Sequence, residues 1–120
     1  MTDDDGLDTI RSRFTRNYPP AIDTGKGWHN ILLEMDTALA AADPVVAYIQ
    51  IKEKWGELRV YTTSTTNEEA RAIIRRAEEK SRVTCEQCGG NGSMHTRGSW
   101  YRTLCGSCAA ETNYVPYQRR

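Results

Sequence analysis

Four cysteines in two pairs are the residues of this chain whose type and spacing most clearly indicate a chemistry. The pairs are Cys85-Glu86-Gln87-Cys88 and Cys105-Gly106-Ser107-Cys108, and sixteen residues separate them. Two such pairs with a spacer of this length are typical of a tetrahedral zinc site, because a tight turn aims both sulfurs of each pair at one ion. The sequence therefore predicts one zinc ion per chain, with four ligands: Cys85, Cys88, Cys105 and Cys108.

The surroundings of the cysteines favour this interpretation over two other uses of thiols. Gly89 and Gly90 follow the first pair and Gly106 lies in the second, and glycine tolerates the backbone of such turns. A redox pair would need a βαβ pattern, which these stretches lack. Disulfides would need an oxidising compartment, which proteins reach with a secretory signal segment that is basic at its start and then apolar. Residues 1–6 are acidic instead, so we expect a cytoplasmic protein. Because four thiolates leave no open position, we expect the zinc to be structural.

Composition indicates a small chain with a lean hydrophobic core. The 120 residues are 38% hydrophobic, the mean hydropathy is -0.67, and no apolar run is long enough to span a bilayer. A metal that holds part of the chain together suits such a lean core. The formal net charge is zero, although residues 1–60 are net acidic and residues 61–120 net basic. An overall basic balance, which non-specific nucleic-acid binding favours, is absent.

Hydrophobic periodicity predicts the helices. Leu7, Ile10 and Phe14 recur at helical spacing and predict a short helix that ends before Pro19-Pro20. Asp43-Pro44 should stop a longer helix over residues 28–42, and Thr66 with Glu69 has capping-box spacing at the start of a helix over 67–82. The apolar stripe of the first long helix is Trp28, Ile31, Leu32, Met35, Leu39 and Ala42; that of the second is Ala70, Ile73, Ile74 and Ala77.

Alternating side chains predict two strands, over residues 45–54 and 58–63, joined by the turn 55–57. The expected core face holds Ile49, Ile51, Leu58 and Val60, and the other face Tyr48, Gln50, Lys52, Arg59 and Tyr61. A loop and a strand over 100–104 should connect the two cysteine turns in a zinc ribbon or treble-clef-like knuckle.

Together these elements predict an α+β fold: a small antiparallel sheet covered by two main helices, with a C-terminal zinc knuckle. We expect four segments. Residues 1–22 form an acidic leader with a short helix, 23–84 an α-β-β-α core, 85–108 the zinc knuckle and 109–120 a tail. Because a small sheet is only marginally stable without further packing, we also expect that the chain can form a homodimer.

Three stretches, 27–32, 51–61 and 84–89 with 103–105, resemble a widespread set of small uncharacterised proteins of bacteriophages, prophages and bacteria. Those proteins share a Gly-Trp start, a Lys-Glu-Lys-aromatic-Gly turn and a Cys-x-x-Cys-Gly knuckle, and the resemblance covers residues 25–108. This chain has Trp55 where phenylalanine is frequent and Glu57 where glycine is. The resemblance implies a small intracellular protein of a mobile element, a context in which genes often encode inhibitors or modifiers of host machinery, immune systems included.

Two surfaces are candidates for binding a partner. Tyr48, Lys52, Arg59 and Tyr61 mix aromatic rings with positive charge, which suits a protein hot spot or base stacking. Arg75 and Arg76 add charge on the second long helix. The sequence leaves open whether the sheet face is exposed or partly covered, and whether the basic helix is only solvated.

The remaining residues of interest have plainer expected roles. We expect His95 to be a solvated loop residue, because four cysteines already complete the metal site. We expect His29 to be a surface or half-buried residue, because no nucleophile or orienting partner for it can be named. The three tryptophans, Trp28, Trp55 and Trp100, are expected in the core or in the packing of the knuckle.

These observations lead to one functional hypothesis and one alternative. No phosphate-binding loop, nucleophile elbow or zinc-protease motif occurs in the sequence, so we expect a non-enzymatic, zinc-stabilised protein that binds and inhibits or modulates a host protein or immune complex. The alternative is a nucleic-acid-binding zinc ribbon that uses the basic C-terminal half.

Overall fold

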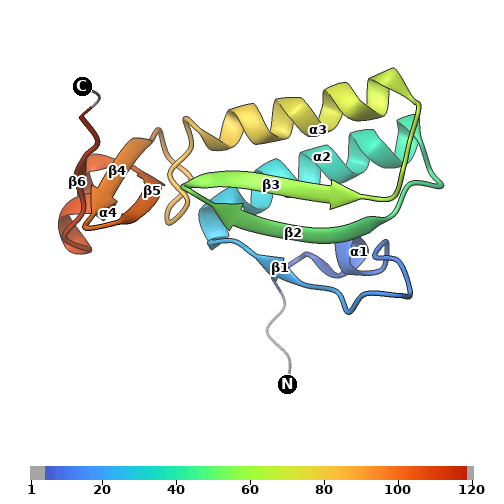
Figure 1. Ribbon diagram of the computed structural model, residues 1–120, viewed down its shortest axis with the longest axis horizontal. Helices are drawn as coiled ribbons and strands as arrows, with labels where there is room; N and C mark the ends of the chain where they lie inside the picture. The colour runs from blue at the N-terminus through green and yellow to red at the C-terminus, as the bar shows by residue number, and fades with distance from the viewer. Residues whose placement is uncertain (1–4, 119–120) are drawn as a thin grey trace.

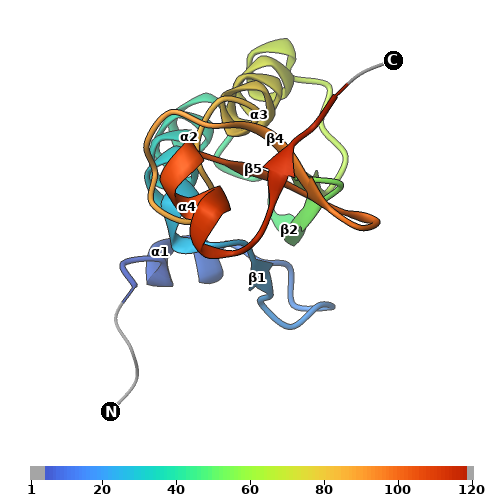
Figure 2. The ribbon, with the colours of Figure 1, turned by 90° about the vertical axis from the view of Figure 1, so that its left-hand side faces the viewer.

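The computed structural model describes residues 5–118 and shows an α+β protein with two small sheets, the smaller of which lies at one end of the molecule next to the hairpin turn of the larger sheet (Figure 1). The larger sheet has the order β1 (Ile22–Asp23), β2 (Tyr48–Lys54), β3 (Glu57–Thr62), and α2 (His29–Ala42) and α3 (Glu68–Ser81) cover one of its faces. The smaller sheet has the order β5 (Trp100–Leu104), β4 (Ser93–Arg97), β6 (Val115–Pro116), with α4 (Gly106–Glu111) packed beside it (Figure 2). Residues 1–4 and 119–120 of the predicted leader and tail lie outside the described residues.

The predicted helix over 28–42 is confirmed and provides much of the core. A 3-10 turn, η1 (Lys26–Trp28), leads into α2, and the helix ends where Asp43 precedes Pro44. The predicted stripe turns inward as a whole, because its members repeat on one side of the helix. Its buried members are Trp28, Ile31, Leu32, Met35 and Leu39, and Ala42 is partly buried.

The predicted helix over 67–82 is confirmed as α3, but its cap is not the expected one. The side chain of Asn67, rather than that of Thr66, accepts the Ala70 N–H at 3.0 Å. The Asn67 amide also donates to the Ala42 carbonyl at 2.9 Å. One residue thus satisfies the first turn of α3 and the last turn of α2, which a capping box at Thr66 could not do.

The two predicted strands form a tight hairpin whose free edge α3 closes. Trp55 and Gly56 make a two-residue turn with positive φ at both positions, 56° and 82°, as type I′ hairpins require. On the outer edge of β3, the Leu58 N–H donates to Ser81 Oγ at 3.0 Å and the Val60 N–H to Glu78 Oε2 at 3.1 Å. Side chains of a helix therefore take the place of a further strand.

The register of β2 overturns one predicted partner-binding residue. A bulge between Tyr48 and Gln50 turns Tyr48 inward, where 1% of its surface is exposed, and leaves Ile49, expected in the core, only half-buried. The Tyr48 hydroxyl donates to Asp36 Oδ1 at 2.8 Å, and Arg13 Nε lies 3.0 Å from the same oxygen. Burial, and next the hydrogen bond to Asp36, raise the pKa of Tyr48. Tyr48 is therefore a core residue.

The N-terminal stretch is part of the main core. The short helix α1 (Asp8–Arg11) ends well before Pro19-Pro20, earlier than predicted, while Leu7, Ile10 and Phe14 are buried as expected. The ring of Phe14 packs against that of Tyr48 at 5.6 Å between centroids. The chain then adds β1 parallel to β2, a two-residue strand that has too few residues to give a sequence pattern.

Replacing Tyr48 by phenylalanine should destabilise the protein by about 1–2 kcal/mol, because the buried carboxylate of Asp36 loses one of its two partners. The measurement is the midpoint of denaturant unfolding. Tyr61→Phe is the matched control, since its ring is 41% exposed and no hydrogen bond of its hydroxyl is recorded among the described residues. Equal midpoints for both variants would remove the role given to the Tyr48–Asp36 contact.

Candidate metal centre

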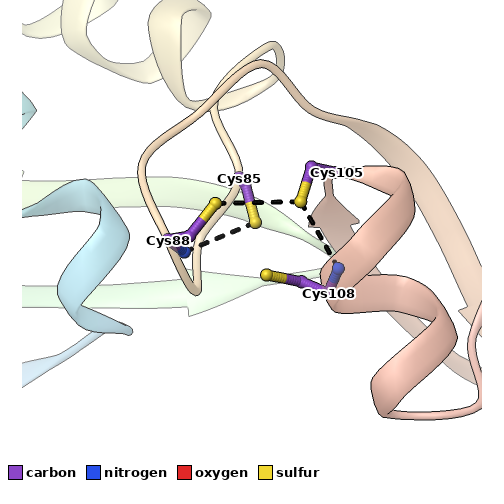
Figure 3. A group of neighbouring side chains, drawn as sticks. All are labelled: Cys85, Cys88, Cys105 and Cys108. Carbon is purple, nitrogen blue, oxygen red and sulfur yellow. Dashed lines mark hydrogen bonds between the residues drawn. The ribbon is translucent and has the colours of Figure 1, made fainter.

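The four predicted ligands come together in space. Cys85 and Cys88 lie in the loop after α3, and Cys105 and Cys108 lie at the first turn of α4, with the side chains of all four converging (Figure 3). Their sulfur atoms are all within 4.8 Å of one another. Among the described residues these four cysteines form the one group of three or more candidate metal ligands. A set of four thiolates at this spacing can surround a single tetrahedral ion.

Backbone N–H groups point at sulfur atoms of the cysteine centre. The Cys88 N–H points to Cys85 Sγ at 3.5 Å and the Cys108 N–H to Cys105 Sγ at 3.4 Å (Figure 3). Burial alone would raise the pKa of the Cys85 thiol, but backbone N–H groups of Cys105, Cys88 and Gln87 outweigh it and lower the pKa to about 6. The backbone thus stabilises negative charge on Cys85, whereas the hydrogen bond with Cys105 raises the pKa of the Cys108 thiol.

The centre belongs to a C-terminal unit, residues 84–117, that is larger than the sequence indicated. The predicted strand over 100–104 is confirmed as β5 and pairs with β4 in a hairpin between the two cysteine turns. Residues 109–116, predicted as tail, instead complete α4 and form β6, and Ala109 and Tyr114 are buried in a second core. Along the chain a cysteine turn, a hairpin and a helix follow one another, which is a treble-clef-like order. Of the two predicted arrangements, a zinc ribbon and a treble-clef-like knuckle, the structure is therefore closer to the second.

The C-terminal unit is docked onto the start of α2 through two hydrogen bonds and one close approach of backbones. The Gly27 N–H donates to the Glu86 carbonyl at 2.7 Å, and the indole N–H of the buried Trp28 donates to the Thr84 carbonyl at 2.9 Å. A Cβ atom on Gly27 would lie 2.2 Å from the Cys85 carbonyl oxygen, so only glycine permits this approach. The Gly-Trp pair of the sequence is thus the surface on which the cysteine turn rests.

Glu86, between the first two cysteines, is a buried carboxylate that reinforces the same contact. Its Oε2 accepts the Gly25 N–H at 2.9 Å, and its Oε1 lies 3.5 Å from Arg102 Nε, an ion pair without a hydrogen bond. Burial raises the pKa of Glu86, although the Gly25 N–H and Arg102 act in the opposite direction. Sequence reasoning missed this residue, because an acidic residue between two cysteines looks like an ordinary exposed one.

Neither histidine belongs to the group of candidate ligands. His95 lies in β4 with 5% of its surface exposed, and its Nδ1 is 2.8 Å from the Ser93 carbonyl oxygen, so the prediction of a solvated loop residue was wrong. His29 is half-buried at the start of α2, as expected.

Two of the three tryptophans are on the surface, contrary to prediction. Trp28 is fully buried, but Trp55 is 61% and Trp100 69% exposed. Trp55 packs edge-on against Tyr101 with ring centroids 5.9 Å apart, and Tyr101 packs in the same way against Tyr117, also at 5.9 Å. We call these three rings, Trp55, Tyr101 and Tyr117, the aromatic row. It begins at the turn of the main hairpin and continues over the C-terminal unit.

The predicted partner-binding residues do not form one surface. Lys52, Arg59 and Tyr61 lie together on the sheet face away from α2 and α3, with Lys52 Nζ 5.9 Å from the centroid of the Tyr61 ring. Arg75 and Arg76 are exposed on α3 and line two different hollows, the first beside the loop 62–65 and the second between α2 and α3. Only the first three therefore share a face.

No protein-family model, no curated protein and no solved structure matches this chain. In the described part of the chain, no helix has the length and apolar character needed to cross a membrane. Arguments about function therefore depend on the geometry of the cysteine centre and of the exposed faces.

Replacing Gly27 by alanine should destabilise the protein by about 1–3 kcal/mol and weaken metal binding, because the added methyl group overlaps the Cys85 and Glu86 backbone. The measurements are the unfolding midpoint and metal retention against a chromogenic chelator. Gly106→Ala is the control, since a Cβ there meets nothing within 4 Å although the residue lies between two cysteines. Metal retention unchanged in Gly27→Ala would show that docking and metal binding are independent.

Proposed function

We propose that the protein is a non-enzymatic, zinc-stabilised binding protein whose contact surface is the aromatic row. The observation that carries the proposal is the position of the row, because its rings come from both units and the cysteine centre holds one of those units together. Tyrosine and tryptophan are enriched in protein hot spots, where rigid rings contribute contact area at little entropic cost.

Zinc is the metal that suits this centre best. Four cysteine sulfurs within 4.8 Å of one another favour zinc among common divalent ions, since magnesium and calcium prefer oxygen ligands. All four positions are occupied by cysteine, so the ion offers no site for water or substrate. The metal then supplies folding energy to residues 84–117, whose own core is small.

A protein partner fits the charges better than a nucleic acid does. The C-terminal unit carries Arg97 and Arg102 against Glu86 and Glu111 within the described residues, and four thiolates with one zinc ion add a charge of about −2. A polyanion would therefore meet little attraction there. The nucleic-acid alternative retains Lys52, Arg59 and Tyr61, whose face combines cations with an exposed ring.

The biological setting follows from the resemblance given above. We propose a cytoplasmic protein of a phage or another mobile element that binds and inhibits or modulates a host protein or immune complex. In this proposal the aromatic row supplies the central contacts, and Lys52, Arg59, Tyr61, Arg75 and Arg76 are peripheral contributors.

Removal of the metal should unfold residues 84–117 and leave much of the main core intact, since binding energy here is folding energy. Elemental analysis should give one zinc ion per chain, and chelation or Cys88→Ser should abolish the amide protection of β4 and β5 in hydrogen exchange. Ser107→Ala, an exposed change between two cysteines, is the matched control. A metal-free chain with full protection of β4 and β5 would refute the structural role of zinc.

The partner can be sought by affinity capture from host lysate, with and without nuclease, followed by mass spectrometry. A discrete protein that survives nuclease and high salt, and that is lost with Trp55→Ala, is the expected result. The double variant Arg59→Ala/Tyr61→Ala tests the open sheet face in parallel. Material that disappears with nuclease, and whose binding falls log-linearly with salt, would instead support the nucleic-acid alternative.

A further inference from the structure

Two neighbouring hollows flank the aromatic row and share two of its rings. Trp55 and Tyr101 contribute to both. The first hollow extends from Trp55 to the exposed indole of Trp100 at the tip of the β4–β5 hairpin, and the second extends from the Trp55–Tyr101 pair to Tyr117 over the side chain of Met94. The surface is thus a ridge of two rings with an apolar, aromatic-walled hollow on either side.

The arrangement of the rings favours a ridged ligand over a flat one. The Trp55 and Tyr101 planes are inclined at 67° and the Tyr101 and Tyr117 planes at 63°, so the rings stand edge to face and do not form a continuous stacking platform. Successive nucleobases stack on continuous aromatic platforms, so this arrangement of rings does not favour a single-stranded nucleic acid. A polyproline II helix has ridges of its own, repeats about every 9 Å (three residues at 3.1 Å each), and docks into aromatic-lined grooves.

The charge of the two hollows also indicates an uncharged ligand. Glu53 and Lys54 are the two charged residues among their lining residues, and their formal charges cancel. Glu53 Oε2 is already engaged, because it accepts the Gly56 N–H at 2.7 Å. A neutral, apolar proline segment complements this surface, whereas a phosphate backbone would find one lysine beside a carboxylate.

We propose that the two hollows on either side of the Trp55–Tyr101 ridge receive a proline-rich, polyproline II segment of the partner protein. This inference rests on the proposed function and specifies the chemistry of the partner at the same surface. Each hollow takes one proline-containing step of the segment, with the pyrrolidine rings against indole and phenol faces. A polyproline II helix is already formed in the free segment, so the segment loses little conformational entropy on binding. The fixed hairpin turn has the same effect for Trp55.

The surface should exist only when the C-terminal unit is folded. The Thr103 hydroxyl donates to the Gly56 carbonyl at 2.7 Å in a buried contact, and the Met94 side chain lies against Gly56. Trp55 therefore meets Tyr101 because β5 is fixed beside the main hairpin. Loss of the metal should separate the two walls of each hollow and abolish binding.

The test is calorimetric titration of the zinc-loaded full chain with a terminally blocked proline oligomer of about ten residues, long enough for three polyproline II turns. Trp55→Ala and Tyr117→Ala should each weaken binding about tenfold or more, as expected for hot-spot aromatics. Tyr18→Ala is the matched control for Tyr117→Ala, because the two rings are 48% and 47% exposed and Tyr18 lines a different hollow. A glycine–serine peptide of equal length should not bind.

Four outcomes would overturn the inference: no heat with the proline oligomer, equal binding by Trp55→Ala, equal binding by the chelated protein, or preference for oligothymidylate of matched length. The same oligomer is added as competitor to the lysate capture described above, which separates the two proposals. A captured protein that depends on Trp55 but is not displaced by the oligomer would leave the proposed function in place and remove the proline-rich ligand. Displacement together with dependence on Trp55 supports both.

Discussion

The contact between the first cysteine turn and the start of α2 is the constraint on which the rest of this structure depends. Gly27 brings its backbone against Cys85 and Glu86, and the buried Trp28 reaches back to the Thr84 carbonyl. The same few residues therefore begin the main helix and support the metal centre. In the folded protein neither unit can move at this point without opening a buried contact, so these few residues fix how the cysteine centre sits against the main core.

The second core is so small that a metal bound at the four cysteines would add much to its stability. Its buried hydrophobic members are Leu104, Ala109 and Tyr114 together with Cys85 and Cys108, so two of the five are themselves candidate ligands. A unit of this size buries too little apolar surface to offset the entropy of ordering its chain. An ion bound at the four sulfurs would supply the difference, as it does for other small metal-bound units.

The features that could be predicted from the sequence are those encoded by local spacing. The cysteine pairs indicated their own convergence, and the stripe from Trp28 to Leu39 indicated its buried side, because a turn or a helix fixes these relations within a few residues. Tyr48, His95, Trp55 and Trp100 were misplaced for a different reason. Their exposure depends on a bulge, on an unpredicted hairpin partner and on where two units meet, and none of these leaves a periodic signal.

The two exposed tryptophans, Trp55 and Trp100, lie on the surface that is proposed to bind the partner. A large apolar side chain is expected inside, and single exposed ones are common, but a row of packed rings with the exposed indole of Trp100 beside it is a contiguous apolar surface. Trp55 is held with positive φ in a type I′ turn, a conformation that a β-hairpin normally assigns to asparagine or glycine. The less favourable residue stands at a position from which its indole packs against Tyr101. Such a choice is difficult to explain by the stability of the hairpin and is readily explained by recognition at the junction of the two units.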